Sequence, residues 1–179
     1  MTKEEHAIVL EYLPNGYPLE GKRLPVIQAI GKASLTLLEL VPRKGAELNI
    51  GEEVYIGEGK RDKIYYILGR LKREKLTEAA KNQLNEVIQN YIKEHEQIFV
   101  DFFNNSDAIN KRMHQLELLP GLGKKHMQEV LKQRKEKPFK DFEDIKQRVA
   151  NLPDPEKIVE KRIIKELTSM ERYNLFTKA

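Results

Sequence analysis

The chain has 179 residues, 40% of them apolar, which fits one large globular domain or two small ones. Its 32 Lys and Arg against 28 acidic residues leave a net charge of only +4, so binding to a polyanion would require local clustering of charge. The absence of Cys excludes disulfides, thiolate zinc sites and cysteine nucleophiles. No segment approaches the roughly 20 apolar residues of a membrane span, and the acidic start MTKEEHAIVL is not a secretory signal, so we expect a cytoplasmic protein with no membrane partner.

Residues 1–73 have the pattern of short β-strands separated by turns. Segments rich in β-branched, aromatic or leucine residues lie at 7–13, 24–31, 34–41, 52–57 and 63–71. The last two look like a hairpin, with one face shared by Val54, Ile56, Ile64, Tyr66 and Leu68. Five short strands in about seventy residues predict a small β-barrel. The stretch LNIGEEVYIG resembles the turn and strand that open many small nucleic-acid-binding (OB-like) barrels.

The tyrosines of this half have two interpretations. Aromatic rings among cations are typical of surfaces on which single-stranded nucleic acid stacks. Tyrosines in small barrels also fill the core or cover its edge, and the sequence favours this second interpretation. The residues concerned are Tyr55, Tyr65 and Tyr66, with Lys60, Arg61, Lys63, Arg70, Lys72 and Arg73.

From Leu76 the apolar residues recur every three or four positions, which is typical of amphipathic helices. Thr77 is placed to cap one long helix that reaches about Phe102. Asn104 to Ser106 interrupt the pattern, and a second helix is expected over 107–118.

Three further helices are expected after it. The first covers 124–135, the second begins at the capping residue Asp141, with Asp144 three positions on, and the third runs from Pro155 to about Met170. The whole pattern predicts an α+β fold: a β-barrel (OB-like) domain at 1–73, a long connecting helix at 74–105 and an all-α domain at 106–179.

The stretch LLPGLGKKHM, residues 118–127, has the composition of an anion site. A helix that starts after Gly123 leaves its first backbone N–H groups without intrahelical partners and carries the positive end of the helix dipole. Gly121 and Gly123 have no Cβ, so a phosphate can approach the backbone, and Lys124 and Lys125 add positive charge.

Residues 116–131, LELLPGLGKKHMQEVL, match the helix-hairpin-helix pattern of apolar–Pro–Gly–apolar–Gly between two helices. One departure is Met127, where the family commonly has a small residue. The resemblance implies that hairpin amides hold a backbone phosphate, at Gly121, Gly123 and Lys125 or His126. It also implies a monovalent cation on the carbonyls of Glu117, Leu119 and Leu122, and no other cofactor.

Such motifs usually occur in pairs, and NLPDPEKIVEKRIIKEL, residues 151–167, resembles a second copy. There Asp154, Pro155 and Glu156 take the places of Gly121, Leu122 and Gly123, which makes this copy a poor phosphate holder. The fold class becomes a tandem helix-hairpin-helix domain after the barrel, with one intact hairpin.

Positive charge clusters beside the intact hairpin. Residues 124–140 contain seven Lys or Arg against two Glu, a local net charge of +5. Such clustering is typical of a protein that follows a phosphate backbone, although cations on an exposed helix face are often only solvated. The candidate nucleic-acid-binding residues are Pro120, Gly121, Leu122, Gly123, Lys124, Lys125, His126, Lys132, Arg134 and Lys135.

Over essentially its full length the chain resembles an archaeal family named for a domain of unknown function, DUF655. That resemblance rests on the β half, the long helix, the hairpin and the segment PFKDFEDI. It implies RNA binding, on grounds of fold, and RNA is preferred over DNA only for this reason and for the barrel half.

Three functions remain open. The first is a non-enzymatic nucleic-acid-binding protein. The second is a glycosylase-like enzyme, because some base-excision glycosylases carry the same hairpin with a Lys in it and an Asp downstream, as Lys124 or Lys125 with Asp141 or Asp144 superficially do. The third is a protein-interaction adaptor. No cluster of carboxylates or histidines at metal-ligand spacing stands out, so we expect no metal site and no catalysis.

Overall fold

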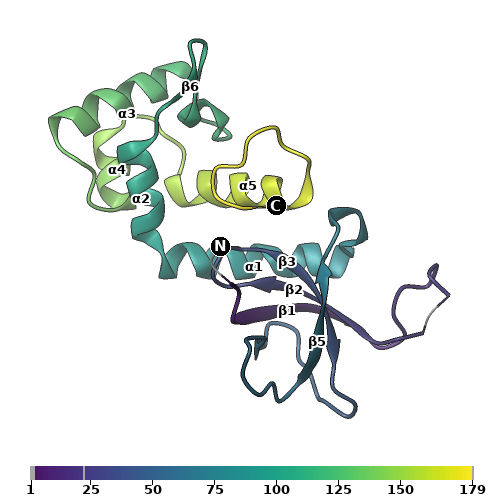
Figure 1. The fold of residues 1–179 in the computed structure, drawn as a ribbon. Helices are drawn as coiled ribbons and strands as arrows, with labels where there is room; N and C mark the ends of the chain where they lie inside the picture. The colour runs from purple at the N-terminus through teal and green to yellow at the C-terminus, as the bar shows by residue number, and fades with distance from the viewer. Residues whose placement is uncertain (1–2, 22, 179) are drawn as a thin grey trace. The chain divides into compact units, whose positions relative to one another are not determined.

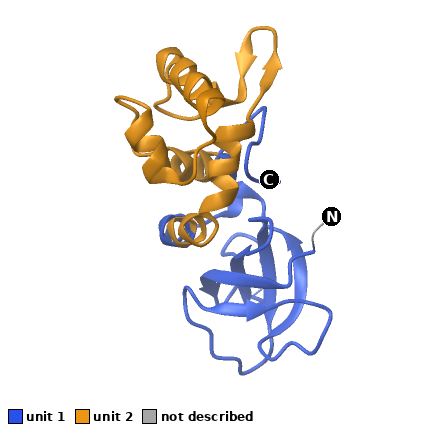
Figure 2. Ribbon diagram, turned by 90° about the vertical axis from the view of Figure 1, so that its left-hand side faces the viewer, with its two compact units in different colours: residues 1–87, 166–179 blue, residues 88–165 orange. Residues whose placement is uncertain are grey.

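The computed structural model describes residues 3–21 and 23–178. The chain divides into two compact units, residues 1–87 with 166–179, and residues 88–165 (Figure 2). Within the described part, none of the helices has the length and apolar character needed to cross a membrane.

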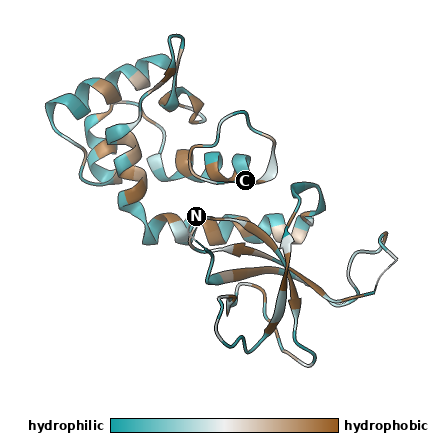
Figure 3. Ribbon diagram, in the orientation of Figure 1, coloured by the Kyte–Doolittle hydropathy of each residue, from teal (hydrophilic) through white to brown (hydrophobic). Residues whose placement is uncertain are grey.

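The first unit contains a curled, five-stranded antiparallel half-barrel sheet (Figure 1). Its strands are β1 (His6–Leu13), β2 (Val26–Gly31), β3 (Leu37–Pro42), β4 (Glu53–Tyr55) and β5 (Ile64–Arg70), in the order β4-β1-β2-β3-β5. The strands are predominantly hydrophobic (Figure 3), and their inward side chains form one core of Ala7, Val9, Ile27, Ala29, Leu38, Leu40, Val54, Ile56 and Ile64.

The hairpin predicted for residues 52–71 is wrong. β4 pairs with β1, and β5 pairs with β3, so the two strands form opposite edges of the sheet. Val54, Ile56 and Ile64 reach the same core in either arrangement, because a burial pattern specifies the face of a strand and not its neighbour.

The predicted face of β5 also changes after Ile64. The pairing of β5 with β3 shifts twice, and the extra residues on β5 are Tyr65 and Leu68. Each bulge reverses the alternation of side chains that follows it. Ile67 therefore packs against the core, whereas Tyr66 and Leu68, expected inside, are 41% and 53% exposed.

A 3-10 turn, η1 (Arg73–Lys75), leads from β5 to helix α1 (Glu78–Glu94), whose start is joined to the sheet. The buried Gln28 of β2 donates to the carbonyl of Lys75 at 2.7 Å and accepts from the N–H of Thr77 at 3.1 Å. The Thr77 hydroxyl accepts from the N–H of Ala80 at 3.1 Å, which confirms it as the cap of this helix.

Residues 166–178 complete the first unit. The carboxylate of Glu166, which is fully buried, accepts hydrogen bonds from the backbone N–H groups of Leu175, Phe176 and Thr177. Arg73 donates to the carbonyl of Ser169 at 2.7 Å. These contacts hold the C-terminal segment against the end of the last helix and the β5–α1 connection.

The second unit contains α2 (Glu96–Asn105), α3 (Lys124–Glu136), α4 (Phe142–Arg148) and most of α5 (Pro155–Thr168). The structure confirms the predicted helices at 124–135, from Asp141 and from Pro155. Asp141 accepts from the N–H of Asp144 at 2.7 Å, as expected of a cap.

Two predicted helices of this region are wrong in part. The long helix is two helices, α1 and α2, interrupted at His95, whose backbone departs from helical values (φ −125°, ψ 32°). The helix expected over 107–118 is a small hairpin, β6 (Ala108–Asn110) with β7 (Met113–His114), followed by a 3-10 turn, η2 (Gln115–Leu118).

Local side-chain hydrogen bonds explain the second error. Asp107 Oδ1 accepts from the N–H of Ala108 at 2.7 Å, and Asn110 Oδ1 accepts from the N–H of Arg112 at 2.8 Å. Asp and Asn compete with helix formation through such bonds, and here they turn the chain twice within a few residues. The apolar spacing that suggested a helix is compatible with the short hairpin.

Candidate nucleic-acid interface

The hairpin before α3 is built on three buried leucines. Leu116, Leu119 and Leu122 are 0%, 2% and 6% exposed. Leu119 N–H donates to the carbonyl of Leu116, and Leu122 N–H to that of Leu119, both at 3.2 Å. Burial of these side chains fixes the path of the loop, and Gly121 between them is exposed.

The two glycines have different structural reasons. Gly121 has φ +82°, a conformation that other residues adopt only with strain, and a Cβ placed on it would lie 3.6 Å from Pro153 Cγ. Gly123 is the N-cap of α3 at φ −83° and ψ 177°, which any residue can adopt. A Cβ at Gly123 would have no neighbour closer than His126 Nδ1 at 4.0 Å, so the space above this amide is open.

The first turn of α3 has backbone donors left over. Gly123 N–H donates to His126 Nδ1 at 3.2 Å, and Met127 N–H donates to the Gly123 carbonyl at 3.0 Å. Within residues 3–21 and 23–178, the N–H groups of Lys124, Lys125 and His126 have no acceptor. They lie at the positive end of a 13-residue helix, where an anion is stabilised.

The predicted binding residues fall into two groups. Gly121, Gly123 and four lysines are exposed, and no ion pair is found for these lysines in the described part of the chain: Lys124, Lys125, Lys132 and Lys135. Leu122 is buried, Pro120 is half-buried, and half-buried His126 uses Nδ1 to cap its own helix, which leaves Nε2 for a ligand.

Arg134 belongs to neither group. Its guanidinium donates to the carbonyl of Phe103 at 3.2 Å and to the carbonyl and hydroxyl of Ser106 at 2.8 and 3.1 Å. Burial lowers its pKa. This side chain closes the end of α2 against α3, so the structure does not present it to a ligand.

Arg148, which the sequence did not single out, organises the basic segment after α3. It donates to the carbonyls of Gln133 and Lys137, both at 2.6 Å, and its guanidinium lies 4.6 Å from the ring centroid of Phe139. Phe139 itself exchanges two hydrogen bonds with the side chain of Asn104. Lys132, Lys135 and Lys137 are thus carried on a segment with a fixed path.

The carboxylates that suggested an enzyme have structural partners. Asp141 caps α4, and Asp144 accepts from the N–H of Lys140 at 3.0 Å and from Arg148 at 3.1 Å. The backbone hydrogen bond from Lys140, and then Arg148, lower the pKa of Asp144. No group of three His, Asp or Glu able to hold a metal ion occurs among the described residues.

The second hairpin lies between α4 and α5 and differs from the first in its amides. Asp154 caps α5, and its Oδ1 accepts from the N–H of Glu156 at 3.1 Å. The chain's own carboxylate therefore occupies the place that a phosphate would take. The contact predicted for a Cβ at Gly121 with Pro153 places the two hairpins side by side.

The monovalent cation expected on the hairpin carbonyls stays a prediction, and a fixed positive charge lies near them. The guanidinium of Arg162, which is buried on α5, donates to the Leu118 carbonyl at 3.2 Å, within the segment that carries the three candidate carbonyls. The Leu119 carbonyl already accepts from Leu122. A fixed positive charge at this place disfavours a second one.

The tyrosines of the first unit separate into a structural residue and an exposed pair. The Tyr55 hydroxyl accepts from the N–H of Gly59 at 3.0 Å, and its ring meets that of His6 edge-on at 5.4 Å. Tyr65 and Tyr66 are 60% and 41% exposed. Tyr65 and Tyr66 therefore do not fill the core but lie on the edge strand β5, and Tyr55 is half-buried.

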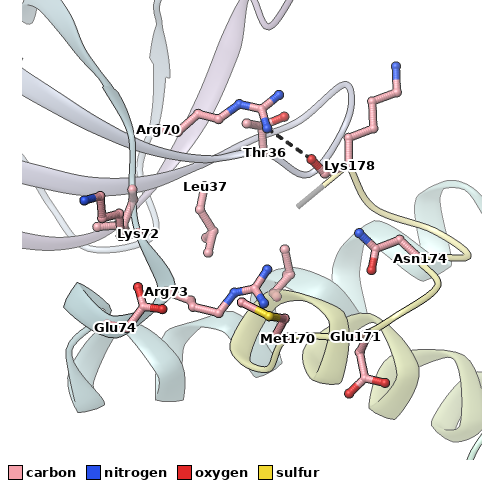
Figure 4. A pocket seen from close by; sticks show the side chains of 12 residues that line it. Thr36, Leu37, Arg70, Lys72, Arg73, Glu74, Met170, Glu171, Asn174 and Lys178 are labelled. Carbon is pink, nitrogen blue, oxygen red and sulfur yellow. Dashed lines mark hydrogen bonds between the residues drawn. The ribbon is translucent and has the colours of Figure 1, made fainter.

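A pocket of about 380 Å³ opens beside the end of β5 in the first unit (Figure 4). Its apolar lining is Leu37, Leu71, Leu167 and Met170, and its charged lining is Arg70, Lys72, Arg73 and Lys178 with the acids Glu74 and Glu171. Arg70 donates to the carbonyl of Lys178 at 3.3 Å, which brings the C-terminal segment to its rim.

Comparisons with known proteins agree on one family. Residues 3–178 match the family model described as "Protein of unknown function (DUF655)". "Uncharacterized protein MJ0038" of Methanocaldococcus jannaschii is 41% identical over 177 residues, which are 98% of this chain and 80% of that protein. The crystal structure of Af1531 from Archaeoglobus fulgidus has a TM-score of 0.84 at 47% identity, covering 97% of this chain and 99% of that one. The chain therefore belongs to the DUF655 family.

Proposed function

We propose that this protein binds nucleic acid without catalysis, and that the hairpin at residues 119–126 holds one backbone phosphate. The observation that carries the proposal is the set of N–H groups at Lys124, Lys125 and His126, which have no acceptor in the described chain and lie beside an open Gly123. Such groups at a helix start bind anions. Because they contact only backbone phosphate, the binding is independent of sequence.

The surrounding charge supports the same ligand. Lys124, Lys125, Lys132 and Lys135 are exposed, and Lys137 and Lys140 continue the basic segment. Cations without partners release counterions when they neutralise phosphates, so affinity would fall steeply with salt. RNA is our preferred ligand over DNA, because of the family resemblance and the barrel-like first half.

The proposal includes a tandem helix-hairpin-helix arrangement with one active hairpin. The pairing is supported by the closeness of Gly121 to Pro153, since a Cβ on Gly121 would lie 3.6 Å from Pro153 Cγ. That only the first hairpin binds phosphate is supported by Asp154, which accepts from the Glu156 N–H in the second. The first helix of the intact motif is reduced to the single turn η2, an unusual feature that Arg162 compensates by binding the Leu118 carbonyl. The curled five-stranded sheet is compatible with a partly open OB-like barrel.

The decisive variant is Gly123→Asp. The backbone at this position accepts Asp without strain, and Asp is among the best N-cap residues, so the fold should be kept or stabilised. The new carboxylate would occupy the free amides and repel phosphate. We expect a loss of affinity for RNA of about tenfold or more, measured by fluorescence anisotropy across a salt series.

Gly123→Asn is the matched control, because it caps the helix with a neutral side chain of the same size. It should lose less affinity than the Asp variant, since it blocks the amides without repelling the ligand. Equal affinity of the Asp variant and the wild type would contradict the hairpin assignment. Gly121 is unsuitable for this test, because its positive φ would make any substitution a test of folding.

A further inference from the structure

The exposed face of β5 in the first unit has a composition that a structural role does not explain. Three of its side chains are large, apolar or aromatic, and open to solvent: Tyr65 at 60%, Tyr66 at 41% and Leu68 at 53%. The two rings meet edge-on, with centroids 5.3 Å apart and planes at 69°, an arrangement that leaves ring faces uncovered. Such a row of exposed side chains is not explained by packing in the sheet core.

A cation contacts one of these rings, and further cations lie on the adjoining loops. The Arg43 guanidinium lies 5.9 Å from the Tyr65 ring centroid and is held there by a hydrogen bond from Nε to the Arg61 carbonyl at 2.7 Å. Lys44 and Lys60 are exposed on the adjoining loops. The acids Glu52 and Glu58 pair with Lys63 and Lys3, which leaves Asp62 as the unpaired acid between Tyr55 and Tyr65 in the described chain.

The geometry of the strand argues against a protein strand as its partner. β5 is an edge strand, but the bulges at Tyr65 and Leu68 break the regular ladder of N–H and C=O groups that an added strand needs. Exposed aromatic rings beside a cation suit instead single-stranded nucleic acid, whose unpaired bases can stack on them. A duplex keeps its base faces inside and would gain little here.

The strand leads to the basic pocket. β5 ends at Arg70, whose side chain belongs to the pocket wall together with Lys72 and Arg73 (Figure 4). The apolar lining at Leu37 and Met170 can accommodate a base, and the cations can contact its phosphate. Seven residues of strand span about 20 Å, enough for several nucleotides.

We propose that the first unit binds single-stranded nucleic acid along β5, with bases stacked on Tyr65 and Tyr66 and a further nucleotide in the pocket beside Arg70. This inference rests on the proposed function for its class of ligand and does not rest on the hairpin. It adds that the preferred nucleic acid is single-stranded and that the protein holds it through its bases.

The test is the double variant Tyr65→Ala/Tyr66→Ala, made in the wild type and in the Gly123→Asp background. The probe is an oligouridylate of about 12 nucleotides, compared with an RNA duplex of the same length. Removing both rings should weaken single-strand binding about tenfold or more in both backgrounds while leaving the salt dependence unchanged. Duplex binding should not change.

Tyr65→Phe/Tyr66→Phe is the matched control, since it keeps both ring faces and should stay within about twofold of the parent. Photocrosslinking of a bromouridine-substituted strand should mark Tyr65 or Tyr66. Unchanged single-strand affinity in the Ala variant, or an equal loss for single strands and duplex, would overturn the inference. If Gly123→Asp weakened binding and the tyrosine double variant did not, the hairpin proposal would stand and the proposed β5 surface would be wrong.

Discussion

At the scale of single residues, the two glycines of the hairpin, Gly121 and Gly123, are needed for different reasons. Gly121 is required by the backbone, because φ +82° excludes a side chain without strain. Gly123 is not, because its backbone is extended and its surroundings are open. Glycine at position 123 is therefore not needed for folding. It leaves the backbone amides at the start of α3 accessible to a ligand.

His114 is the residue whose protonation should affect stability. Its Nδ1 accepts from the Leu116 N–H at 3.1 Å, a bond that needs the neutral ring. Burial lowers the His114 pKa, Arg134 lowers it further, and Asp107 and Glu117 act in the opposite direction. The unfolded chain thus binds the proton more tightly than the folded one.

We expect the free energy of unfolding to fall as pH drops from about 7.5 to about 5.5, because the unfolded His114, with a pKa near 6.5, gains its proton first. Urea unfolding at several pH values measures this. His114→Asn keeps an acceptor for Leu116 and does not titrate, so its stability should fall less over the same range. Parallel curves for the two proteins would contradict the assignment.

Residues could be predicted from sequence where their partners are local. Thr77 and Asp141 cap helices that start immediately after them, and both were expected. The structural roles of Arg134 and Arg148 could not be predicted, because their acceptors are backbone carbonyls up to 31 positions away. In sequence they cannot be told from the solvated lysines beside them.

At the scale of elements, α3, α4 and α5 were predictable because each has a cap, an apolar stripe and a clear end. The break at His95 and the hairpin at 108–114 were not, because apolar spacing persists through both. The two bulges of β5 were equally hidden, although they decide which side chains of the strand meet solvent. For this reason the sequence alone favours a structural role for Tyr65 and Tyr66.

Glu166 allows a prediction about the end of α5. Its buried carboxylate accepts three backbone N–H groups, and Gln offers a single acceptor oxygen while directing N–H against the others. Glu166→Gln should reduce the free energy of unfolding by about 1–3 kcal/mol and speed amide exchange at residues 175–177. Urea unfolding and hydrogen exchange measure both effects.

Glu74→Gln is the matched control in the same unit, because Glu74 is exposed and has no hydrogen bond or ion pair in the described chain. It should leave stability and exchange unchanged. If Glu166→Gln behaved like this control, the carboxylate would not be what holds the C-terminal segment.

At the scale of the whole molecule, the two proposed surfaces belong to different compact units. A strand that engages both should bind more tightly than either contact alone allows, because the second contact becomes intramolecular. We expect affinity for oligouridylates to rise in a step as length increases. Either Gly123→Asp or the tyrosine double variant should remove the step, and anisotropy with a series of lengths measures it.

A smooth rise with length, unaffected by either variant, would contradict cooperation between the two surfaces. At this scale the sequence predicted the mixed α and β composition correctly, since strand and helix periods occupy separate stretches of the chain. It could not predict the pairing of β4 with β1, or that residues 166–178 return to the unit that contains the sheet.

Because residues 166–178 belong to the unit that contains the sheet, this unit cannot be completed early in synthesis. The first unit is discontinuous: its sheet and the start of α1 are synthesised first, and Glu166 with the segment it holds comes only after all of residues 88–165. A nascent chain can therefore form the sheet while Met170 and Lys178, which line the pocket, have not yet been synthesised. The pocket beside β5 therefore depends on residues that are synthesised only after the whole of residues 88–165.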